Sequence, residues 1–297
     1  MACPEYKLST TFTVVLTTVC CISGILAVVQ NLAVLLALRS MHSLRYTARY
    51  FMASLAAAEI LTGFAGNLHY ILNHSRKLDI TFMRTEGAIF LFTTTTVTFS
   101  LSNVALDRYI AITSPLQYHN RMTSTRCLTL IILSWGLVLF GISMTYVVLV
   151  ENLVHMWISV SIISLLIPFC IITFCYFGIC QASRRTSVLL GNVTEAQQIA
   201  ENDRQRKTAC TFGIITGLFI VVFMPSFIHD CVVVMANPPD LNDPRCDNST
   251  RKAWICINVI SYFSAVFDPW VYAIRMRDFR RALKELFQSL WRILHLS

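Results

Sequence analysis

The chain has 297 residues, of which 55% are hydrophobic and only 13% are charged, and its mean hydropathy is +0.60. Soluble domains carry roughly 25% charged residues, so this chain lacks the charge to cover a water-exposed surface. The composition therefore argues against a water-soluble enzyme, a disordered chain and a nucleic-acid-binding protein. The net charge of +8 has to be explained by where the charges lie.

Charge-poor stretches, taken in chain order, predict seven membrane-spanning helices. A span needs roughly 20 apolar residues with charges excluded or paired. Seven cores satisfy this requirement, and only those of the second and seventh spans contain an acid, Glu59 and Asp268. The expected spans are about 11–38, 48–73, 82–113, 127–149, 155–183, 206–236 and 252–275. The predicted fold class is thus an all-α membrane protein, with a single seven-transmembrane domain over residues 1–297.

The two ends of the chain carry different signals. The first span is far longer than the roughly 7–15 apolar residues of a signal peptide, so we expect it to remain in the mature protein. After the last span, residues 277–290 predict an amphipathic helix that lies on the inner leaflet and contacts membrane lipid. Its apolar residues recur at intervals of three and four, with Arg and Lys between them: Phe279, Leu283, Leu286, Phe287 and Leu290.

Lys and Arg are distributed unequally between the two sides of the predicted bundle. One side holds 17 of the 24 basic residues and the other holds 7. The richer side is expected to be cytoplasmic, which places the N-terminus outside, the C-terminus inside and the chain in the plasma membrane. Topology and anionic lipid explain most of the positive charge. Glycosylation sequons at Asn73 and Asn248 fall in outer loops, whereas the sequon at Asn192 falls inside.

The connections are short, and none carries a catalytic or cofactor motif. The outer loop after the fourth span is expected to be nearly absent, from Glu151 to about Val154. The sequence has no internal repeat, which disfavours a transporter built from two halves. No Walker, Rossmann or zinc-ligand spacing is present, so we expect no enzyme activity, no cofactor and no metal site.

The ends of the third and seventh spans carry the most specific motifs. The third ends with Asp107-Arg108-Tyr109, and the seventh ends with Asp268-Pro269-Trp270-Val271-Tyr272. Each of the other spans has one or two landmark residues: Asn31, Glu59, Trp135, Pro168 with Tyr176, and Pro225. Along its whole length the chain resembles a class A (rhodopsin-like) G-protein-coupled receptor. Its very short second outer loop and its Asp-Pro motif are closest to the melanocortin, cannabinoid and adenosine receptor branch.

The resemblance implies a receptor that passes a signal, or constitutive activity, to a heterotrimeric G protein, and the branch implies the Gs type. It assigns G-protein coupling and the activation switch to Asp107, Arg108, Tyr109, Tyr176, Asp268, Pro269 and Tyr272. It also implies a helix 6 hinge at Pro225, with Phe223 in the place of the usual tryptophan. The alternative interpretations are a snorkelling interfacial Arg108 and a Phe223 that only fills the core. Gln205 is uncharged where some relatives place an acid that pairs with Arg108. The inactive state is therefore predicted to be held only weakly at this point.

Two acids within the spans predict an intramembrane polar site. Glu59 and Asp268 lie at matching depths, and each costs several kcal/mol if it is ionised and unpaired. We expect them to face each other near Asn31 and Ser264. The site is interpreted either as a sodium or water site that biases the inactive state, or as a hydrogen-bonded pair that fixes the packing.

Helical spacing also predicts an outer ligand pocket, and the outer cysteines are candidates for a disulfide. The pocket is mostly apolar with acids near its mouth, which suits a small amphipathic ligand with a positive or hydrogen-bond-donating end. Its expected residues are Glu86, Phe90, Leu91, Thr94, Phe227, Asp230, Asn258, Ser261 and Tyr262. Met83 stands where most of the class has its helix 3 cysteine, so the disulfide candidates are Cys3, Cys231, Cys246 and Cys256.

Two other functions compete with the receptor interpretation. A seven-helix transporter or channel would need acids and broken helices that line a continuous path across the membrane. Only Glu59 and Asp268 are acids of this kind, and no chain of acids connects them to the outer side, which disfavours this interpretation. The second alternative is a receptor-like protein that does not signal and instead pairs with other receptors.

Overall fold

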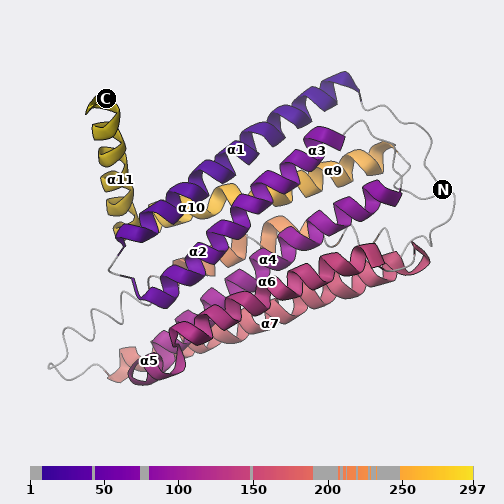
Figure 1. Cartoon of the computed structure of the whole chain (residues 1–297). Helices are drawn as coiled ribbons and strands as arrows, with labels where there is room; N and C mark the ends of the chain where they lie inside the picture. The colour runs from indigo at the N-terminus through magenta and orange to yellow at the C-terminus, as the bar shows by residue number, and fades with distance from the viewer. Residues whose placement is uncertain are drawn as a thin grey trace.

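The structure is a computed structural model in which helices lie side by side in an elongated bundle, as Figure 1 shows. It describes residues 9–41, 44–73, 80–147, 150–189 and 248–296, and between the last two ranges residues 207, 210–211, 213–218, 220–226, 228 and 232. Every regular element in this described part is a helix. The prediction of an all-α protein is therefore confirmed.

The helices follow the chain in this order: α1 (Thr10–Ser40), α2 (Tyr46–Leu61), the π-helical turn η1 (Thr62–Gly66), α3 (Asn67–Asn73), α4 (Ile80–Thr113), the 3-10 turn η2 (Pro115–Gln117), α5 (Tyr118–Arg121), α6 (Ser124–Val147), α7 (Val150–Leu189), α9 (Asn248–Tyr262), α10 (Ser264–Arg275) and α11 (Arg277–Leu296). Among the described residues, five helical stretches are long and apolar enough to cross a membrane: Thr10–Ser40, Tyr46–His69, Gly87–Thr113, Ser124–Met144 and Ile255–Ile274. Two shorter apolar stretches, Leu166–Ala182 and Gly213–Ser226, lie within the fifth and sixth expected spans.

The α4 helix forms the centre of the bundle. In the apolar core of α4, 76% of the residues are buried, against 22% in α1 and in α6. Two buried hydrogen bonds tie α4 to its neighbours: Asn103 donates to the Ser134 hydroxyl of α6 at 2.9 Å, and Thr98 donates to the Ser164 carbonyl of α7 at 3.2 Å. Large apolar side chains instead point outward from α1, α6 and α7, as expected for helices that face lipid.

The second span is interrupted by η1, which the sequence pattern did not predict. Two helices approach closely there, because a Cβ on Gly63 would lie 2.5 Å from the Cβ of Ala27 in α1. The wide turn weakens local backbone bonding. Asn67 compensates by donating to the Gly63 carbonyl at 2.8 Å, while its own side-chain oxygen accepts from Ser23 of α1 at 2.9 Å.

The connection between the fourth and fifth spans is nearly absent, as expected, but its predicted position at Glu151 to Val154 is wrong. Residues Glu151 to Val154 are the beginning of α7, which is helical from Val150, and only residues 148–149 lie outside the described part between α6 and α7. The physical reason is that this segment contains no Gly or Pro that would stop a helix.

The last helix turns away from the bundle axis beside the ends of α1 and α10 (Figure 1). Met276 is extended and ends α10, after which α11 runs to Leu296, beyond the expected end at residue 290. Phe279 is buried against the Tyr272 ring, with ring centroids 5.8 Å apart. Arg280 donates to the Ala273 and Ile274 carbonyls at 3.0 and 2.7 Å, which caps α10 and fixes the start of α11.

Candidate functional site

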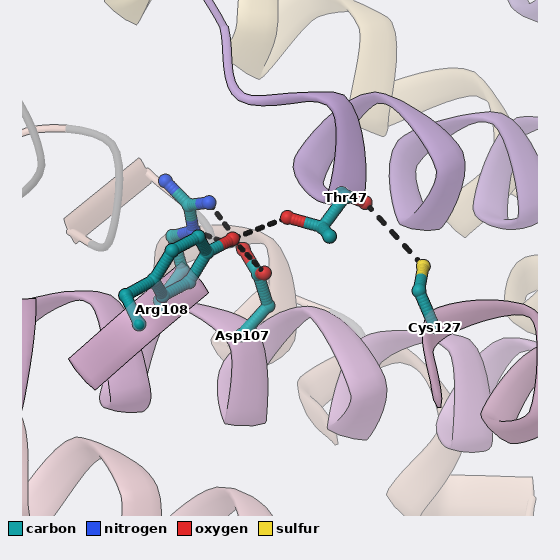
Figure 2. A network of polar contacts seen from close by, with 5 residues as sticks. Thr47, Asp107, Arg108 and Cys127 are labelled. Atoms are coloured by element: carbon teal, nitrogen blue, oxygen red, sulfur yellow. Dashed lines mark hydrogen bonds and ion pairs between the residues drawn. The ribbon is translucent and has the colours of Figure 1, made fainter. Parts of the chain in front are cut away.

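A buried ion pair lies at the inner end of α4. The Nε of Arg108 donates to Oδ2 of Asp107 at 2.9 Å, and Nη2 of Arg108 contacts the same oxygen. Each side chain is only 1% exposed. Because a buried guanidinium without a partner is strongly unfavourable, the position of Arg108 depends on the Asp107 carboxylate. Figure 2 shows the pair with Thr47 and Cys127 nearby.

The chain folds back after α4 and brings Tyr118 to the same carboxylate. Ser114 has a non-helical backbone ahead of Pro115, which ends α4 and starts the η2 turn. Tyr118 follows at the start of α5 and is fully buried. Its hydroxyl donates to Oδ1 of Asp107 at 2.6 Å, so the two oxygens of this carboxylate bind two different partners.

The first turn of α2 completes a network that we call the Asp107 network: Asp107, Arg108, Tyr118, Thr47 and Arg45. The Thr47 hydroxyl bonds to the Tyr118 hydroxyl, which already donates to Asp107, so Thr47 is the donor. The Arg45 guanidinium lies over the Tyr118 ring, 4.2 Å from its centroid, in a cation–π contact. Three separate segments therefore converge on one acid.

The Tyr118 hydroxyl is suited to donate rather than to ionise. Burial raises the pKa of Tyr118 above its ordinary value, and the nearby Asp107 carboxylate raises it further. The phenol therefore keeps its proton throughout the physiological pH range. A protonated phenol stabilises the Asp107 carboxylate without competing with Arg108 for it.

The other expected switch residues lie close to this network. The Tyr109 ring packs on Phe174 of α7, with centroids 5.4 Å apart, and fills the space above Gly178. Tyr176 lies near Thr216 in the Gly213–Ser226 stretch and within electrostatic range of Arg108. Tyr272 is buried in α10, where its ring packs against Phe279 of α11, and it lies within electrostatic range of Tyr176.

The structure places the intramembrane acids together. Glu59 of α2 lies beside Asp268 of α10, and both are buried. Neither Glu59 oxygen has a hydrogen bond of good geometry in the described part of the chain, and neither has the Ser264 hydroxyl. Asn31 joins α1 to α10, because its amide donates to the Ala265 carbonyl at 2.8 Å, one helical turn before Asp268, and to the Ala27 carbonyl at 3.0 Å. Pro269 is buried within α10.

The hinge residues lie in the Gly213–Ser226 stretch. Phe223 is buried in the main core, and Pro225 continues the same helical run with an exposed ring. Asn258 and Ser261 of α9 hydrogen-bond to residues of this stretch on the two sides of Pro225.

The expected pocket is only partly described. Leu91 is buried against Gly141 of α6, and Thr94 is buried in α4. Tyr262 differs from the expectation: it packs against Gly66 and the α1 residues Leu16 and Cys20, on the side of α9 that faces α1. Glu86 and Phe90 lie in α4 with side chains outside the described part, and Phe227 and Asp230 lie outside the described residues.

The expected modification sites are also partly described. Asn73 is the last residue of α3 and Asn248 is the first of α9. The Cys256 thiol is free and its side chain is exposed on α9, so Cys256 forms no disulfide with another described residue. The other three candidates, Cys3, Cys231 and Cys246, lie outside the described residues. No cluster of metal-binding side chains occurs among the residues that the structure describes.

Three members of the Asp107 network are not apparent from the sequence. Tyr118 follows Asp107 by eleven positions, and its approach depends on the turn at Pro115. Thr47 and Arg45 come from a different helix. The one local signal was the Ser114-Pro115 pair, which predicts a chain break but gives no partner for the residues after it.

Comparisons with known proteins identify the family to which the chain is similar. Residues 30–272 match the model of the 7 transmembrane receptor (rhodopsin family). The human (Homo sapiens) adenosine receptor A2a is 26% identical, over 90% of this chain and 70% of its own. Melanocortin receptor 3 of Rattus norvegicus is 26% identical over 89% and 82%, and 5-hydroxytryptamine receptor 6 of Mus musculus is 23% identical over 89% and 68%.

The family match covers most of the chain, including both motifs at the inner end of the bundle. It confirms the predicted seven-transmembrane fold and the resemblance to class A receptors. Members of the family act in general as receptors rather than as enzymes. The chain therefore belongs to the rhodopsin family of seven-transmembrane receptors, multi-pass membrane proteins that signal through G proteins.

Proposed function

We propose that the chain lies in the plasma membrane with its N-terminus outside, and that it transmits a small amphipathic extracellular ligand, or its own spontaneous opening, to a Gs-type G protein. The excess of Lys and Arg in the inner loops supports this orientation. Two relatives are named for the small molecules adenosine and 5-hydroxytryptamine, which supports a ligand of that size. The Gs type rests on the likeness to the adenosine and melanocortin receptors.

The observation that carries this proposal is the buried Arg108–Asp107 pair. In the closed state, the Asp107 carboxylate holds the Arg108 guanidinium against α4. Activation releases Arg108 toward the G protein and toward Tyr176, which lies within its electrostatic range. A ligand drives this change only if it binds the open conformation more tightly than the closed one, because equal affinity for both shifts no population.

The outer pocket and the intramembrane acids have distinct roles in this proposal. Thr94, Asn258 and Ser261 border the inner part of the proposed ligand pocket, where the buried Thr94 hydroxyl, which has no hydrogen-bond partner in the described part of the chain, suits a hydrogen-bonding ligand. The Glu59–Asp268 pair lies between α2 and α10, and its interaction favours the closed conformation of the bundle. The α11 helix rests its apolar face on the lipid of the inner leaflet.

The proposal is tested by measuring ligand-free G-protein activation in cells for each class of Gα. We expect a signal through the Gs class above that of mock-transfected cells, and we expect Arg108→Ala to abolish it. Arg281→Ala is the matched control, because Arg281 is an exposed residue of α11. A signal that survives Arg108→Ala contradicts the switch, and the absence of any signal contradicts the proposed spontaneous coupling.

Orientation is tested separately with epitope tags at the two ends of the chain in intact cells. We expect an antibody to reach only the N-terminal tag. Both tags on the same side of the membrane would contradict a bundle with an odd number of spans.

A further inference from the structure

Two hydrogen bonds join the Gly213–Ser226 stretch to α9, one on each side of Pro225. The Ser226 hydroxyl donates to Oδ1 of Asn258. The Ser261 hydroxyl donates to the Val222 carbonyl at 3.2 Å and to the Ile257 carbonyl of its own helix at 3.1 Å. The three polar side chains are at most 3% exposed, so no solvent competes for these bonds. We call the two bonds between helices the Pro225 clamp.

The proline explains why a side chain from another helix can bond to this backbone. Pro225 has no N–H, and its ring pushes against the carbonyl of the preceding turn. A kink at proline therefore loosens the carbonyls three and four residues earlier, at Val222 and Val221. Ser261 supplies a donor from α9 to the Val222 carbonyl, next to the Val221 carbonyl whose helical donor Pro225 removes.

The two bonds lie on opposite sides of the bending point. With the N-terminus outside, the stretch runs outward, so Val222 lies on the cytoplasmic side of Pro225 and Ser226 on the extracellular side. An outward swing of the cytoplasmic half about Pro225 lengthens the Ser261–Val222 bond. The same swing leaves the Ser226–Asn258 bond near the pivot.

We propose that Ser261 is a positioning residue that holds the receptor closed by tying the cytoplasmic half of the Pro225 hinge to α9, while the Ser226–Asn258 bond serves as the pivot. This inference rests on the proposed function and adds to it a determinant of the basal activity. Opening costs little at Ser261 itself, because its hydroxyl keeps the Ile257 carbonyl as acceptor. The cost falls on the Val222 carbonyl, which loses the hydrogen bond from the buried Ser261 hydroxyl.

The clamp supplies a restraint that the Asp107 network does not. Asp107, Tyr118 and Thr47 hold Arg108 from α4, α5 and α2, and none of these belongs to the stretch that swings. Gln205, which precedes this stretch, carries no charge to attract Arg108. A hydrogen bond directly on the hinge therefore acts on the moving segment itself.

The test is Ser261→Ala in the full-length receptor, purified into lipid nanodiscs without ligand. We expect nucleotide exchange on the G protein to rise by about threefold to tenfold, the shift that the loss of one buried hydrogen bond produces. We also expect faster hydrogen–deuterium exchange in amides 220–226, Pro225 excepted because it has no N–H. Ser143→Ala is the matched control, because the Ser143 hydroxyl of α6 is exposed and donates to the Leu139 carbonyl of its own helix. It should change neither readout.

Two readouts separate this inference from the proposed function. If Arg108→Ala removes the signal but Ser261→Ala leaves it unchanged or lowers it, the clamp is overturned and the receptor function stands. If no variant activates any G protein, the proposed function is overturned, and the exchange of amides 220–226 then decides the clamp alone. Exchange in Ser261→Ala equal to that in Ser143→Ala would overturn the clamp in that case.

Discussion

Replacing Tyr118 with Phe should raise the ligand-free activity of the receptor. The substitution removes only the hydroxyl, which donates to Asp107 at 2.6 Å and accepts from Thr47. The aromatic ring stays, and with it the cation–π contact to Arg45. The closed state therefore loses a polar restraint on the carboxylate that holds Arg108, while the packing around the ring is retained.

The size of the effect follows from the nature of this bond. A buried hydrogen bond to a charged acceptor contributes about 1.5–3 kcal/mol. The Thr47 hydroxyl also loses its acceptor, which adds to the cost. The lower end of this range already corresponds to about a tenfold change in the ratio of open to closed receptor. We therefore expect basal nucleotide exchange on the G protein to increase by about tenfold or more.

Tyr46→Phe is the matched control for this experiment. The Tyr46 hydroxyl donates to the Met122 carbonyl at 3.0 Å, so it ties α2 to the same inner loop but does not touch Asp107. Nucleotide exchange should be compared for the two variants at equal receptor concentration. An increase of the same size in both would show that any loosening of the loop activates the receptor, and no increase in Tyr118→Phe would refute the role of the hydroxyl.

Two further predictions concern the stability of the bundle, measured as the midpoint of thermal unfolding in detergent. Gly178→Ala places a Cβ 2.4 Å from the Tyr109 ring, so the ring has to move and the variant should lose about 1–3 kcal/mol. Gly136→Ala should keep or raise the midpoint, because no atom from another part of the chain lies within 4 Å of its new Cβ and Ala favours a helix. A lower midpoint in Gly136→Ala, or an unchanged midpoint in Gly178→Ala, would contradict this packing. Asn31→Ala removes the 2.8 Å bond to the Ala265 carbonyl and should cost about 1–3 kcal/mol, so an unchanged midpoint would show that this bond between α1 and α10 contributes nothing.

Much of the fold could be predicted from where charges are absent. A lipid environment excludes unpaired charges, so the charge-free cores marked the spans before any contact was known. The pattern gave no sign of the π-helical turn at Thr62–Gly66, because that turn depends on the approach of Ala27 from another helix. It also placed a loop at Glu151–Val154, where charge and polarity interrupt the apolar run but nothing breaks the helix.

The site was predictable only where a residue stands out within its own stretch of sequence. Asp107 and Arg108 are neighbours in the chain, and Glu59 and Asp268 stand out as acids in apolar spans, so their sequence positions alone drew attention. Tyr118, Thr47 and Ser261 are ordinary residues whose importance comes from partners on other helices. Tyr262 shows the same limit, since helical spacing fixed its helix but not the side that faces α1.

The most direct test of the Arg108 switch is ligand-free nucleotide exchange with Asp107→Asn. Asparagine keeps the shape of the side chain and still accepts from Tyr118, but it removes the charge that holds the guanidinium in a site only 1% exposed. Breaking a buried ion pair in this way costs the closed state about 3–5 kcal/mol. We expect exchange on the G protein to rise at least tenfold over the wild type at equal receptor concentration, with Glu285→Gln on the exposed face of α11 as the control. Exchange at or below the wild-type rate in Asp107→Asn would contradict the switch.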